Sequence, residues 1–383
     1  MVARGEGRTR LGRGERVSMM NGRVLSRRDF TKMGAMGLVA GALPRVEAQA
    51  GGQRIGYCII GLGEIAKHFM AGVQGSEHAK VTGLVSGDRS KAERIAAQAG
   101  VPKESIYSYE DMDRMRDNKA IDAVYVALPN NMHAEYTIRS AKAGKHVLCE
   151  KPMCVTVEEA EQMIAACKTA NVKLMIAYRC QYEPLNLEAI GMIRSGAIGE
   201  VQSIESAFGF NATKGVWRLN KKMAGGGSLF DVGIYSLNAT RYLTGEAPAE
   251  FRAYTSTRDH DGRFDQMEES VSWVTRFPSG ILASCSTTYG AMMPGFFQVN
   301  GSKGWVGMQP AFSYEGLRLR ASLPGGQEID KANPEKDPTQ FRREADHLAE
   351  CIRENKTPKT PGEEGLRDMQ HMFAIYRAAG VTL

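Results

Sequence analysis

The chain of 383 residues is long enough for two domains, and its composition, 43% hydrophobic and 24% charged, is typical of a globular protein. Its formal net charge is +6, but the first 50 residues hold ten Lys and Arg against four acids, whereas residues 51–383 hold 39 of each sign. Because the excess of positive charge is confined to one end, a nucleic-acid partner for the folded part is excluded.

The first 50 residues are predicted to be a cleaved export signal. The motif Ser26–Lys32 (SRRDFTK) precedes an apolar, Gly- and Ala-rich stretch over residues 33–43, and Ala48–Ala50 (AQA) is typical of a cleavage site. The pattern looks like a twin-arginine signal, which implies the twin-arginine (Tat) export machinery as a partner and a periplasmic location. The apolar stretch is too short for a stable membrane anchor. A basic terminus with a chance pair of arginines is the alternative.

The seven cysteines do not form a recognisable framework. Their number is odd, no two of them form a CxxC pair, and most fall in predicted strands or helices. Neither a disulfide scaffold nor a metal site is therefore predicted. The cysteines are expected to be buried small apolar residues.

The first predicted strand of the folded part ends in a glycine turn. An apolar run over residues 54–60 leads into the segment Gly61-Leu62-Gly63-Glu64-Ile65-Ala66, after which a helical pattern follows. Gly61 allows the tight turn, Gly63 lets the backbone approach a pyrophosphate, and Ala66 permits close packing of the helix on the strand. The pyrophosphate of a dinucleotide would then lie on the helix N-terminus. An ordinary Gly-rich turn is the alternative.

Strands and helices alternate from this turn onward. Helices are expected at residues 64–74, 90–99, 109–116, 132–143 and 157–170, and strands at 80–86, 121–128, 146–149 and 173–177, with a short segment at 106–107. This alternation predicts an α/β fold, a parallel doubly wound Rossmann sheet over residues 51–177, whose ligand lies at the carboxyl ends of the strands.

The pattern changes at residue 178. Helices at 184–194, 229–242, 340–355 and 363–379 accompany extended runs at 201–210, 250–257, 270–276, 281–287, 296–300 and 304–308. These predict a second, α+β domain over residues 178–383 with an open, mainly antiparallel sheet. A homodimer or higher homo-oligomer is expected to form through the open face of that sheet.

The end of the second predicted strand favours NADP over NAD. Folds that bind NAD place an acid there to hold the ribose 2′-hydroxyl, but this chain has Ser86, followed by Gly87 and Asp88. Arg89 and Lys91 supply cations for a 2′-phosphate. Asp88 keeps NAD open as the less favoured cofactor.

Two further loops are expected beside the nicotinamide. Leu128-Pro129-Asn130 and His133 follow the fourth strand, and Glu150-Lys151-Pro152 ends the fifth. A lysine at the carboxyl end of a parallel strand, fixed by the proline after it, can point into the cleft beside the nicotinamide. A surface lysine is the alternative.

Asp231 and Tyr235 are the candidates for acid-base chemistry. They lie four residues apart on the helix predicted after Gly225–Gly227, so they share one face. Oxidation of a sugar hydroxyl requires a general base, and reduction of a carbonyl requires a general acid. The ordinary pKa of tyrosine is near ~10, and a neighbouring lysine is expected to lower it toward the working pH. For Tyr235 alone, a packed core aromatic is the alternative.

These motifs together resemble one family. Gly61–Gly63, Glu150–Pro152, Tyr178-Arg179, Trp217-Arg218, Gly225–Tyr235 and Pro361–Gly365 look like the glucose-fructose oxidoreductase / inositol dehydrogenase / MocA (Gfo/Idh/MocA) family, in its periplasmic glucose-fructose (sugar–sugar) oxidoreductase branch, and the resemblance spans residues 55–379. It implies Lys151 beside the nicotinamide, Asp231 orienting the sugar and Tyr235 as the acid/base catalyst.

The resemblance also implies the remaining contacts. Ser86 and Lys91 would hold the 2′-phosphate, and the substrate pocket would be lined by Tyr178, Arg179 and Arg218. The full set of expected cofactor contacts is Gly61, Leu62, Gly63, Glu64, Ile65, Ser86, Gly87, Arg89, Lys91, Leu128, Pro129, Asn130, His133, Glu150, Lys151, Arg179, Trp217 and Arg218.

The activity implied by the resemblance is an NADP-dependent oxidoreductase of small-molecule sugars. A protein exported folded would carry its NADP tightly bound and reset it in place, by a ping-pong cycle that oxidises an aldose at C1 to the lactone and reduces a second sugar, a ketose or an aldose, to a polyol. The alternatives are an ordinary NAD(P)-dependent sugar dehydrogenase, an NAD-dependent redox glycosidase of the same superfamily, and a noncatalytic sugar-binding protein. Glucose-fructose oxidoreductases of this branch have a long N-terminal arm after the signal peptide. In this sequence only Gly51–Gln53 would lie between the predicted cleavage site and the first strand region.

Overall fold

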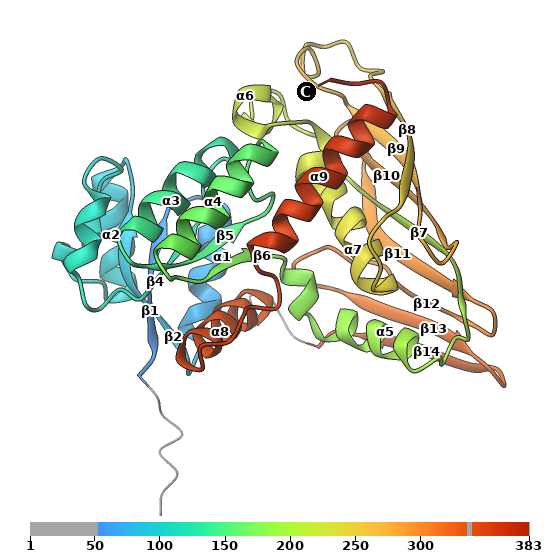
Figure 1. The fold of residues 1–383 in the computed structure, drawn as a ribbon, viewed down its shortest axis with the longest axis horizontal. Coiled ribbons are helices and arrows are strands. Elements are labelled where there is room, and N and C mark those ends of the chain that lie inside the picture. The colour runs from blue at the N-terminus through green and yellow to red at the C-terminus, as the bar shows by residue number, and fades with distance from the viewer. Residues whose placement is uncertain (1–52, 335–338, 383) are drawn as a thin grey trace, which may run out of the picture. The chain divides into compact units, whose positions relative to one another are not determined.

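Two sheets, each built by a different half of the chain, organise the protein (Figure 1). The computed structural model describes residues 53–334 and 339–382. The predicted export signal at residues 1–50 lies outside these ranges, and residues 51–383 form one compact unit.

The first sheet is six-stranded and parallel, with strand order β3-β2-β1-β4-β5-β6, as the alternation of elements predicts. Its elements in chain order are β1 (Ile55–Ile60), α1 (Glu64–Gln74), β2 (Ala79–Val85), α2 (Arg89–Ala99), β3 (Ile106–Tyr107), β4 (Ala123–Val126), α3 (His133–Lys142), β5 (His146–Glu150), α4 (Val157–Thr169) and β6 (Leu174–Ala177).

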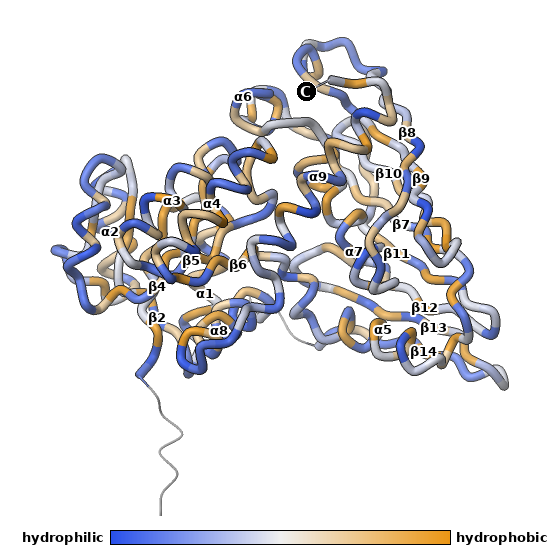
Figure 2. Tube along the Cα trace, in the orientation of Figure 1, coloured by the Kyte–Doolittle hydropathy of each residue, from blue (hydrophilic) through white to orange (hydrophobic). Residues whose placement is uncertain are grey.

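The strands of this sheet are buried on both faces because helices cover each side. All six residues of β1 are buried, which is why its sequence is a continuous apolar run rather than an alternating one. In the core, the ring of Phe69 from α1 stacks on Tyr125 of β4 at a centroid distance of 3.8 Å and meets Tyr57 of β1 edge-on at 5.5 Å. Figure 2 shows hydrophobic residues along these inner strands and hydrophilic residues in the outer loops.

The second sheet has eight strands in the order β14-β13-β12-β11-β7-β10-β9-β8 and is antiparallel except for the pair β7 and β10. Its strands are β7 (Val201–Gly209), β8 (Glu250–Ser256), β9 (Ser270–Arg276), β10 (Leu282–Thr288), β11 (Met293–Gly301), β12 (Trp305–Met308), β13 (Arg318–Leu323) and β14 (Gln327–Ala332). The helical elements of this half are α5 (Pro184–Arg194), α6 (Lys221–Ala224), a π-helical segment η6 (Leu229–Gly233), α7 (Ile234–Thr244) and α9 (Gly362–Ala378). The mixed architecture confirms the predicted fold class.

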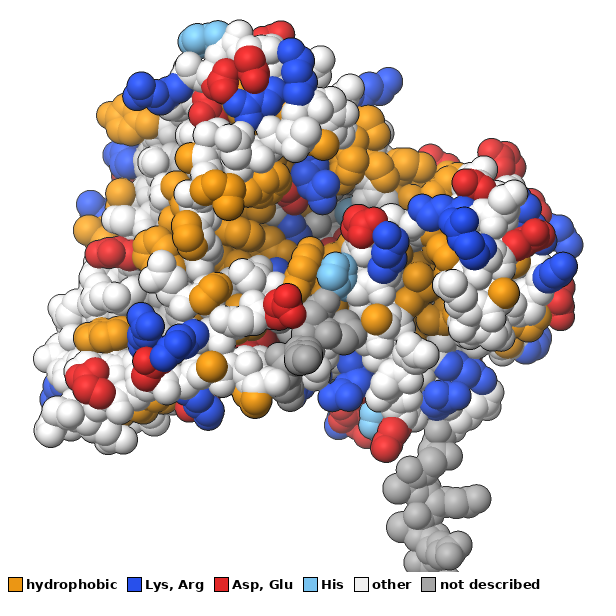
Figure 3. Space-filling model, turned by 180° about the vertical axis from the view of Figure 1, so that it is seen from behind, with side chains coloured by type: hydrophobic (Ala, Val, Ile, Leu, Met, Phe, Trp, Pro, Cys, Tyr) orange, Lys and Arg blue, Asp and Glu red, His pale blue; other side chains and the backbone are white. Residues whose placement is uncertain are grey.

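Helices α5, α7 and α9 pack on one face of the second sheet and leave the other face open. Alternate residues of β8, β9 and β10 point to the open side, and Tyr254, Val274 and Leu282 are exposed there. Figure 3 shows hydrophobic side chains gathered over this half of the surface. The open face is therefore more apolar than a fully solvated surface requires.

Helix α8 (Thr339–Arg353) returns from the end of the chain to the first sheet. Its Phe341, Ala345 and Leu348 belong to the same buried cluster as β1 and α1, and the hydroxyl of Tyr57 donates to the carbonyl of Ala345 at 2.9 Å. Residues near the C-terminus therefore complete the core of the N-terminal half.

Three local predictions differ from the structure. The helix expected at 109–116 is a 3₁₀ turn over Met112–Asp117. The single helix expected at 229–242 begins as the π-helical segment η6. Strands β13 and β14 were not predicted. β14 is an exposed edge strand whose sequence, QEIDKA, carries no apolar alternation, whereas β13 does alternate, with Leu319 and Ala321 buried.

The seven cysteines are all buried and free, as predicted. Among the residues that the structure describes, no group of His, Cys, Asp and Glu is arranged to hold a metal ion. None of the helices in the described ranges is long and apolar enough to cross a membrane.

Candidate active site

A cleft of about 420 Å³ lies where the carboxyl ends of β4 and β5 face η6 and α7. It brings together twelve of the residues predicted from the sequence, although these are far apart along the chain. They are Glu64, Ile65, Leu128, Asn130, His133, Glu150, Lys151, Arg179, Trp217, Arg218, Asp231 and Tyr235. This is the edge of a parallel sheet at which ligands of doubly wound folds bind.

The glycine turn has the geometry that a dinucleotide needs. Gly61 has a φ of +90°, and a Cβ there would lie 2.5 Å from the carbonyl oxygen of Ala127, so no other residue fits. Gly63 precedes α1 with no side-chain cap, and a Cβ there would meet no atom within 4 Å. The start of α1 therefore has no side-chain cap and leaves space beside Gly63, which suits a phosphate group.

The end of β2 is arranged differently from the sequence expectation. Asp88 caps its own helix, since its Oδ1 accepts a hydrogen bond from the Lys91 amide at 2.9 Å. Arg89 is not a free cation: its guanidinium donates to the Ile106 carbonyl at 2.8 Å and to Glu93 at 3.0 Å. Ser86 accepts from the Asp88 amide at 3.1 Å, and Lys91 forms no ion pair with any described residue.

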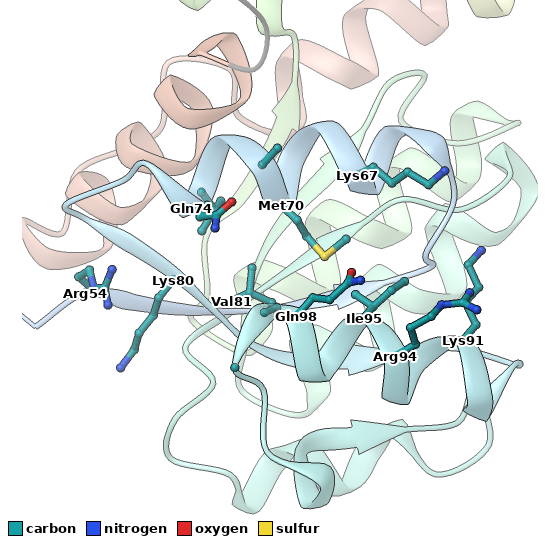
Figure 4. Close-up of a pocket in the computed structure, with 14 residues that line it drawn as sticks. Arg54, Lys67, Met70, Gln74, Lys80, Val81, Lys91, Arg94, Ile95 and Gln98 are labelled. Atoms are coloured by element: carbon teal, nitrogen blue, oxygen red, sulfur yellow. The ribbon is translucent and has the colours of Figure 1, made fainter.

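A second hollow, of about 720 Å³, lies between α1 and α2 (Figure 4). It shares no residue with the cleft, although it is the larger of the two. Figure 4 shows Lys67, Lys91 and Arg94 at one end and Arg54 and Lys80 at the other. Since its lining holds no carboxylate, tyrosine or histidine for acid-base work, we place the chemistry in the cleft.

Lys151 is held at the end of β5 by polar contacts on two sides. Its Nζ donates to the backbone carbonyl of Asp231 at 2.6 Å and lies 3.4 Å from Oδ1 of the same residue. Its own amide donates to Oε2 of Glu150 at 3.2 Å, and Glu150 in turn accepts from the Tyr125 hydroxyl at 2.5 Å. The ammonium group is therefore fixed against η6.

The carboxylate of Asp231 is the centre of the polar network. Its Oδ2 accepts from Nε of Arg218 and from the hydroxyl of Tyr289, each at 2.9 Å. Burial disfavours its ionised form, but Lys151 and Arg218 outweigh burial and hold the pKa of Asp231 below its usual value. Asp231 is therefore ionised and charge-paired at neutral pH.

The segment that carries Asp231 is braced from β10, from α9 and from the loop before β9. Oε1 of Glu268 accepts from the Leu229 amide at 3.3 Å and from the Tyr376 hydroxyl at 2.8 Å. The hydroxyl of Thr287 donates to the Ser228 carbonyl at 3.2 Å. A Cβ at Gly227 would lie 2.5 Å from the Glu268 carbonyl, so only glycine permits this approach.

The cation beside the Tyr235 hydroxyl is Arg179, not Lys151. Nη2 of Arg179 donates to that hydroxyl at 3.2 Å, whereas Nζ of Lys151 lies over the ring, 4.4 Å from its centroid. Burial raises the pKa of Tyr235 well above its usual value, and Arg179 offsets this only in part. The prediction that a neighbouring lysine lowers this pKa is therefore wrong.

Some predicted residues have other roles in this structure. Tyr178 is buried outside the cleft and lines a small cavity on the far side of Lys151 and Tyr235, so it does not line the substrate pocket. The two ring nitrogens of His133 lie 2.9 Å from the carbonyls of Leu128 and Pro152, which joins the two loops. The side chain of Asn130 donates to the Ala224 carbonyl at 2.8 Å and connects its loop to α6.

Sequence reasoning missed several residues of the site. The cleft is also lined by His68, Phe208, Phe210, Val232, Phe312, Ser313 and Tyr314, and Tyr289 binds Asp231 from behind it. Aromatic faces of this kind pack against the C–H groups of a sugar. No motif marks these residues, because they come from separate helices, strand ends and loops that only the fold brings together.

Comparisons with known proteins agree with this geometry. A model of the oxidoreductase family with an NAD-binding Rossmann fold matches residues 55–178, and one of the GFO/IDH/MocA C-terminal domain matches residues 187–307. The NADP⁺-dependent D-xylose 1-dehydrogenase of Haloarcula marismortui is 31% identical over 335 residues, which cover 84% of this chain and 90% of that protein.

Two solved structures illustrate the range of the likeness. The aldose-aldose oxidoreductase from Caulobacter crescentus, complexed with glycerol, superposes with a TM-score of 0.83 at 44% identity, covering 86% of this chain and 98% of that one. KijD10, a 3-ketoreductase from Actinomadura kijaniata solved with NADP, gives a TM-score of 0.74 at 22% identity over 85% of this chain and 97% of that one, a likeness of fold alone.

Proposed function

The chain belongs to the Gfo/Idh/MocA family of oxidoreductases, and from this membership we propose that it is an NADP-dependent sugar oxidoreductase with a retained cofactor. It oxidises an aldose at C1 to the lactone and then reduces a second sugar, a ketose or an aldose, to a polyol. The observation that carries the proposal is the convergence of Lys151, Asp231 and Tyr235 in one cleft at the carboxyl edge of the Rossmann sheet.

The residues at the edge of the first sheet fit NADP. Gly61 and Gly63 leave room for the pyrophosphate at the start of α1, and Ser86 and Lys91 would hold the 2′-phosphate. Asp88, the acid that would favour NAD, is engaged as a helix cap. When bound, NADP supplies the acceptor and donor of two electrons. The NADP⁺-dependent relative supports this choice of cofactor.

The protein's own part is to hold the sugar and move one proton. Asp231 and Lys151 orient hydroxyl groups, because both are charged and fixed by the contacts described above. Tyr235 takes the proton of the anomeric hydroxyl when C1 is oxidised and returns a proton to the carbonyl oxygen of the second sugar. Arg179 stabilises the phenolate that is present before the first step and is formed again by the second.

An absorbance measurement tests the proposal. The mature protein is purified without added nucleotide, and the absorbance of reduced nicotinamide is followed after glucose and then after fructose or another carbonyl sugar. A rise followed by a fall supports a retained cofactor and a ping-pong cycle. Turnover only with added NADP contradicts retention and supports an ordinary dehydrogenase, the function named for the xylose-oxidising relative. Cleavage of a chromogenic glycoside would indicate a redox glycosidase. Sugar binding with no change in nicotinamide absorbance would indicate a noncatalytic binding protein.

We further propose that the protein is exported by the Tat machinery to the periplasm and acts there as a homodimer. The motif at Ser26–Lys32 supports the export route. The exposed apolar side chains on the open face of the second sheet, Tyr254, Val274 and Leu282, support an interface at that face. Fractionation of cells that express the full chain, compared with a variant in which both Arg27 and Arg28 are replaced by Lys, tests the location.

A further inference from the structure

The orientation of the Asp231 carboxylate has a cause outside the cleft. Oδ2 is turned away from Lys151 and accepts two hydrogen bonds, from Arg218 and from Tyr289, while Oδ1 faces Lys151 at 3.4 Å. Arg218 is half exposed at the mouth of the cleft and stacks on Trp217, so its side chain is the less fixed of the two donors to Oδ2.

Tyr289 is the fixed donor. It directly follows β10, is fully buried, and does not line the cleft. Its ring packs edge-on against Phe210 at a centroid distance of 5.1 Å and belongs to a small buried cluster with Ala212, Val232 and Phe264. Its amide donates to the Glu269 carbonyl at 2.9 Å. Both the ring and the backbone of Tyr289 are therefore held independently of its hydroxyl.

We propose that Tyr289 is a positioning residue of the active site: its hydroxyl fixes the rotamer of Asp231 so that Oδ1 faces Lys151 and the bound sugar. Tyr289 does not touch substrate and acts through Asp231. The inference rests on the proposed function, because it assigns to Asp231 the task of orienting a sugar hydroxyl. It predicts that the hydroxyl, rather than the ring, of Tyr289 matters for turnover.

The charges around the pair are consistent with this role. Asp231 faces Lys151 from β5 and Arg218 from the loop before α6, and Tyr289 is surrounded by Asp231, Arg218 and Glu268. Burial and the Asp231 carboxylate raise the pKa of Tyr289 well above its usual value. The hydroxyl is therefore protonated at all working pH values and always donates.

The variant Tyr289→Phe tests the proposal, with Tyr57→Phe as its matched control. Each substitution removes one buried hydroxyl that donates at 2.9 Å, but the hydroxyl of Tyr57 binds the Ala345 carbonyl of α8, and neither of these residues lines the cleft. Sugar oxidation is measured with added NADP, so that the result does not depend on retention of the cofactor. We expect kcat of Tyr289→Phe to fall about tenfold or more, since a hydrogen bond to a charged group is lost, with a smaller change in KM. We expect Tyr57→Phe to keep wild-type kcat.

The pH profile separates positioning from mere packing. Loss of a hydrogen bond to its ionised form raises the pKa of Asp231, so the acid limb of kcat/KM moves to higher pH in Tyr289→Phe and stays in place in Tyr57→Phe. Infrared difference spectra against Asp231→Asn report the same carboxyl titration without any turnover, and so test the inference even if the protein oxidises no sugar. Wild-type kinetics together with an unchanged titration of Asp231 in Tyr289→Phe would overturn it.

Discussion

The hydroxyl of Tyr235 lies 3.2 Å from a guanidinium nitrogen of Arg179, while Nζ of Lys151 lies over the ring of the same tyrosine. These two cations thus contact different parts of Tyr235. Arg179 is anchored by the carbonyls of Phe312 and Ser313 and by Gln340, and it donates to the Tyr235 hydroxyl. Lys151 is anchored on Asp231 and lies against the face of the tyrosine ring.

Tyr235→Phe is expected to lower kcat by about 10²- to 10⁴-fold, the usual contribution of a general acid-base group. The ring keeps its contacts with Phe208 and Phe312, so the free energy of unfolding should change little. Steady-state kinetics and denaturant unfolding measure the two quantities. Tyr242→Phe is the control. It also removes a hydroxyl from α7, and that hydroxyl donates to the side chain of Asn186. Full turnover by Tyr235→Phe would eliminate it as the acid/base group.

The rate of sugar oxidation is expected to rise with pH from neutral into the alkaline range. The raised pKa of Tyr235 means that the phenolate needed to accept a proton is scarce at neutral pH and grows as pH increases. In Arg179→Lys the guanidinium that donates to the hydroxyl is lost, so the rise should move to still higher pH. Single-turnover reduction of NADP at a series of pH values measures this. A pH-independent oxidation rate in the wild type would contradict the assignment.

Lys91→Gln is expected to weaken NADP binding about tenfold and to leave NAD binding unchanged, because Lys91 is free to pair with a 2′-phosphate. Arg89→Gln is the matched control, since the guanidinium of Arg89 is held by Ile106 and Glu93. Calorimetric titration with adenosine 2′,5′-bisphosphate isolates the phosphate contact from the nicotinamide. An equal loss of affinity in both variants would show that Arg89 leaves its partners to bind the phosphate.

Glu268→Gln is expected to flatten the pH dependence of stability. Burial raises the pKa of Glu268 from 4.5 to about 7, so the folded state binds the proton more tightly than the unfolded chain does. The stability from this group is complete below about pH 4.5 and is lost as pH rises to about 7, by up to about 3 kcal/mol. The variant should therefore match the wild type at pH 5 and exceed it at pH 8 in denaturant unfolding. Glu205→Gln, at an exposed position of β7, should follow the wild type at both pH values.

Leu282→Glu is expected to convert a dimer to monomers, because Leu282 lies on the open face of the second sheet and is 44% exposed. Leu187→Glu is the control: Leu187 is also 44% exposed but belongs to α5, which covers the opposite face. Light scattering after size-exclusion chromatography gives the mass of each. A dimeric mass for Leu282→Glu would place the interface elsewhere.

The pattern of apolar residues in the sequence predicted both sheets. Strands buried on both faces are apolar throughout, and strands buried on one face alternate apolar and polar residues. The helix at Pro184–Arg194 and the strand at Ser270–Arg276 have the bounds expected from their patterns. The edge strand β14 could not be predicted from periodicity, because an exposed strand needs no apolar side.

The site was predictable where a residue belongs to a motif tied to the end of a strand. Lys151 follows β5, and the spacing of Asp231 and Tyr235 places both in the cleft even though the first turn is π-helical. The partners of Asp231 and Tyr235 could not be assigned, because Tyr289 and Arg179 reach them through tertiary packing. The direction of the pKa shift of Tyr235 could not be predicted for a related reason. It depends on how deeply the side chain is buried, and the spacing of residues in the sequence does not report this.

The return of α8 to the first sheet sets the order in which the molecule can be built. A ribosome releases β1 and α1 long before Phe341, Ala345 and Leu348, yet these late residues close the core in which Tyr57 and Phe69 are buried. The core of the first sheet can therefore reach its final packing only after nearly the whole chain has been made. The earliest segment made is completed by one of the last.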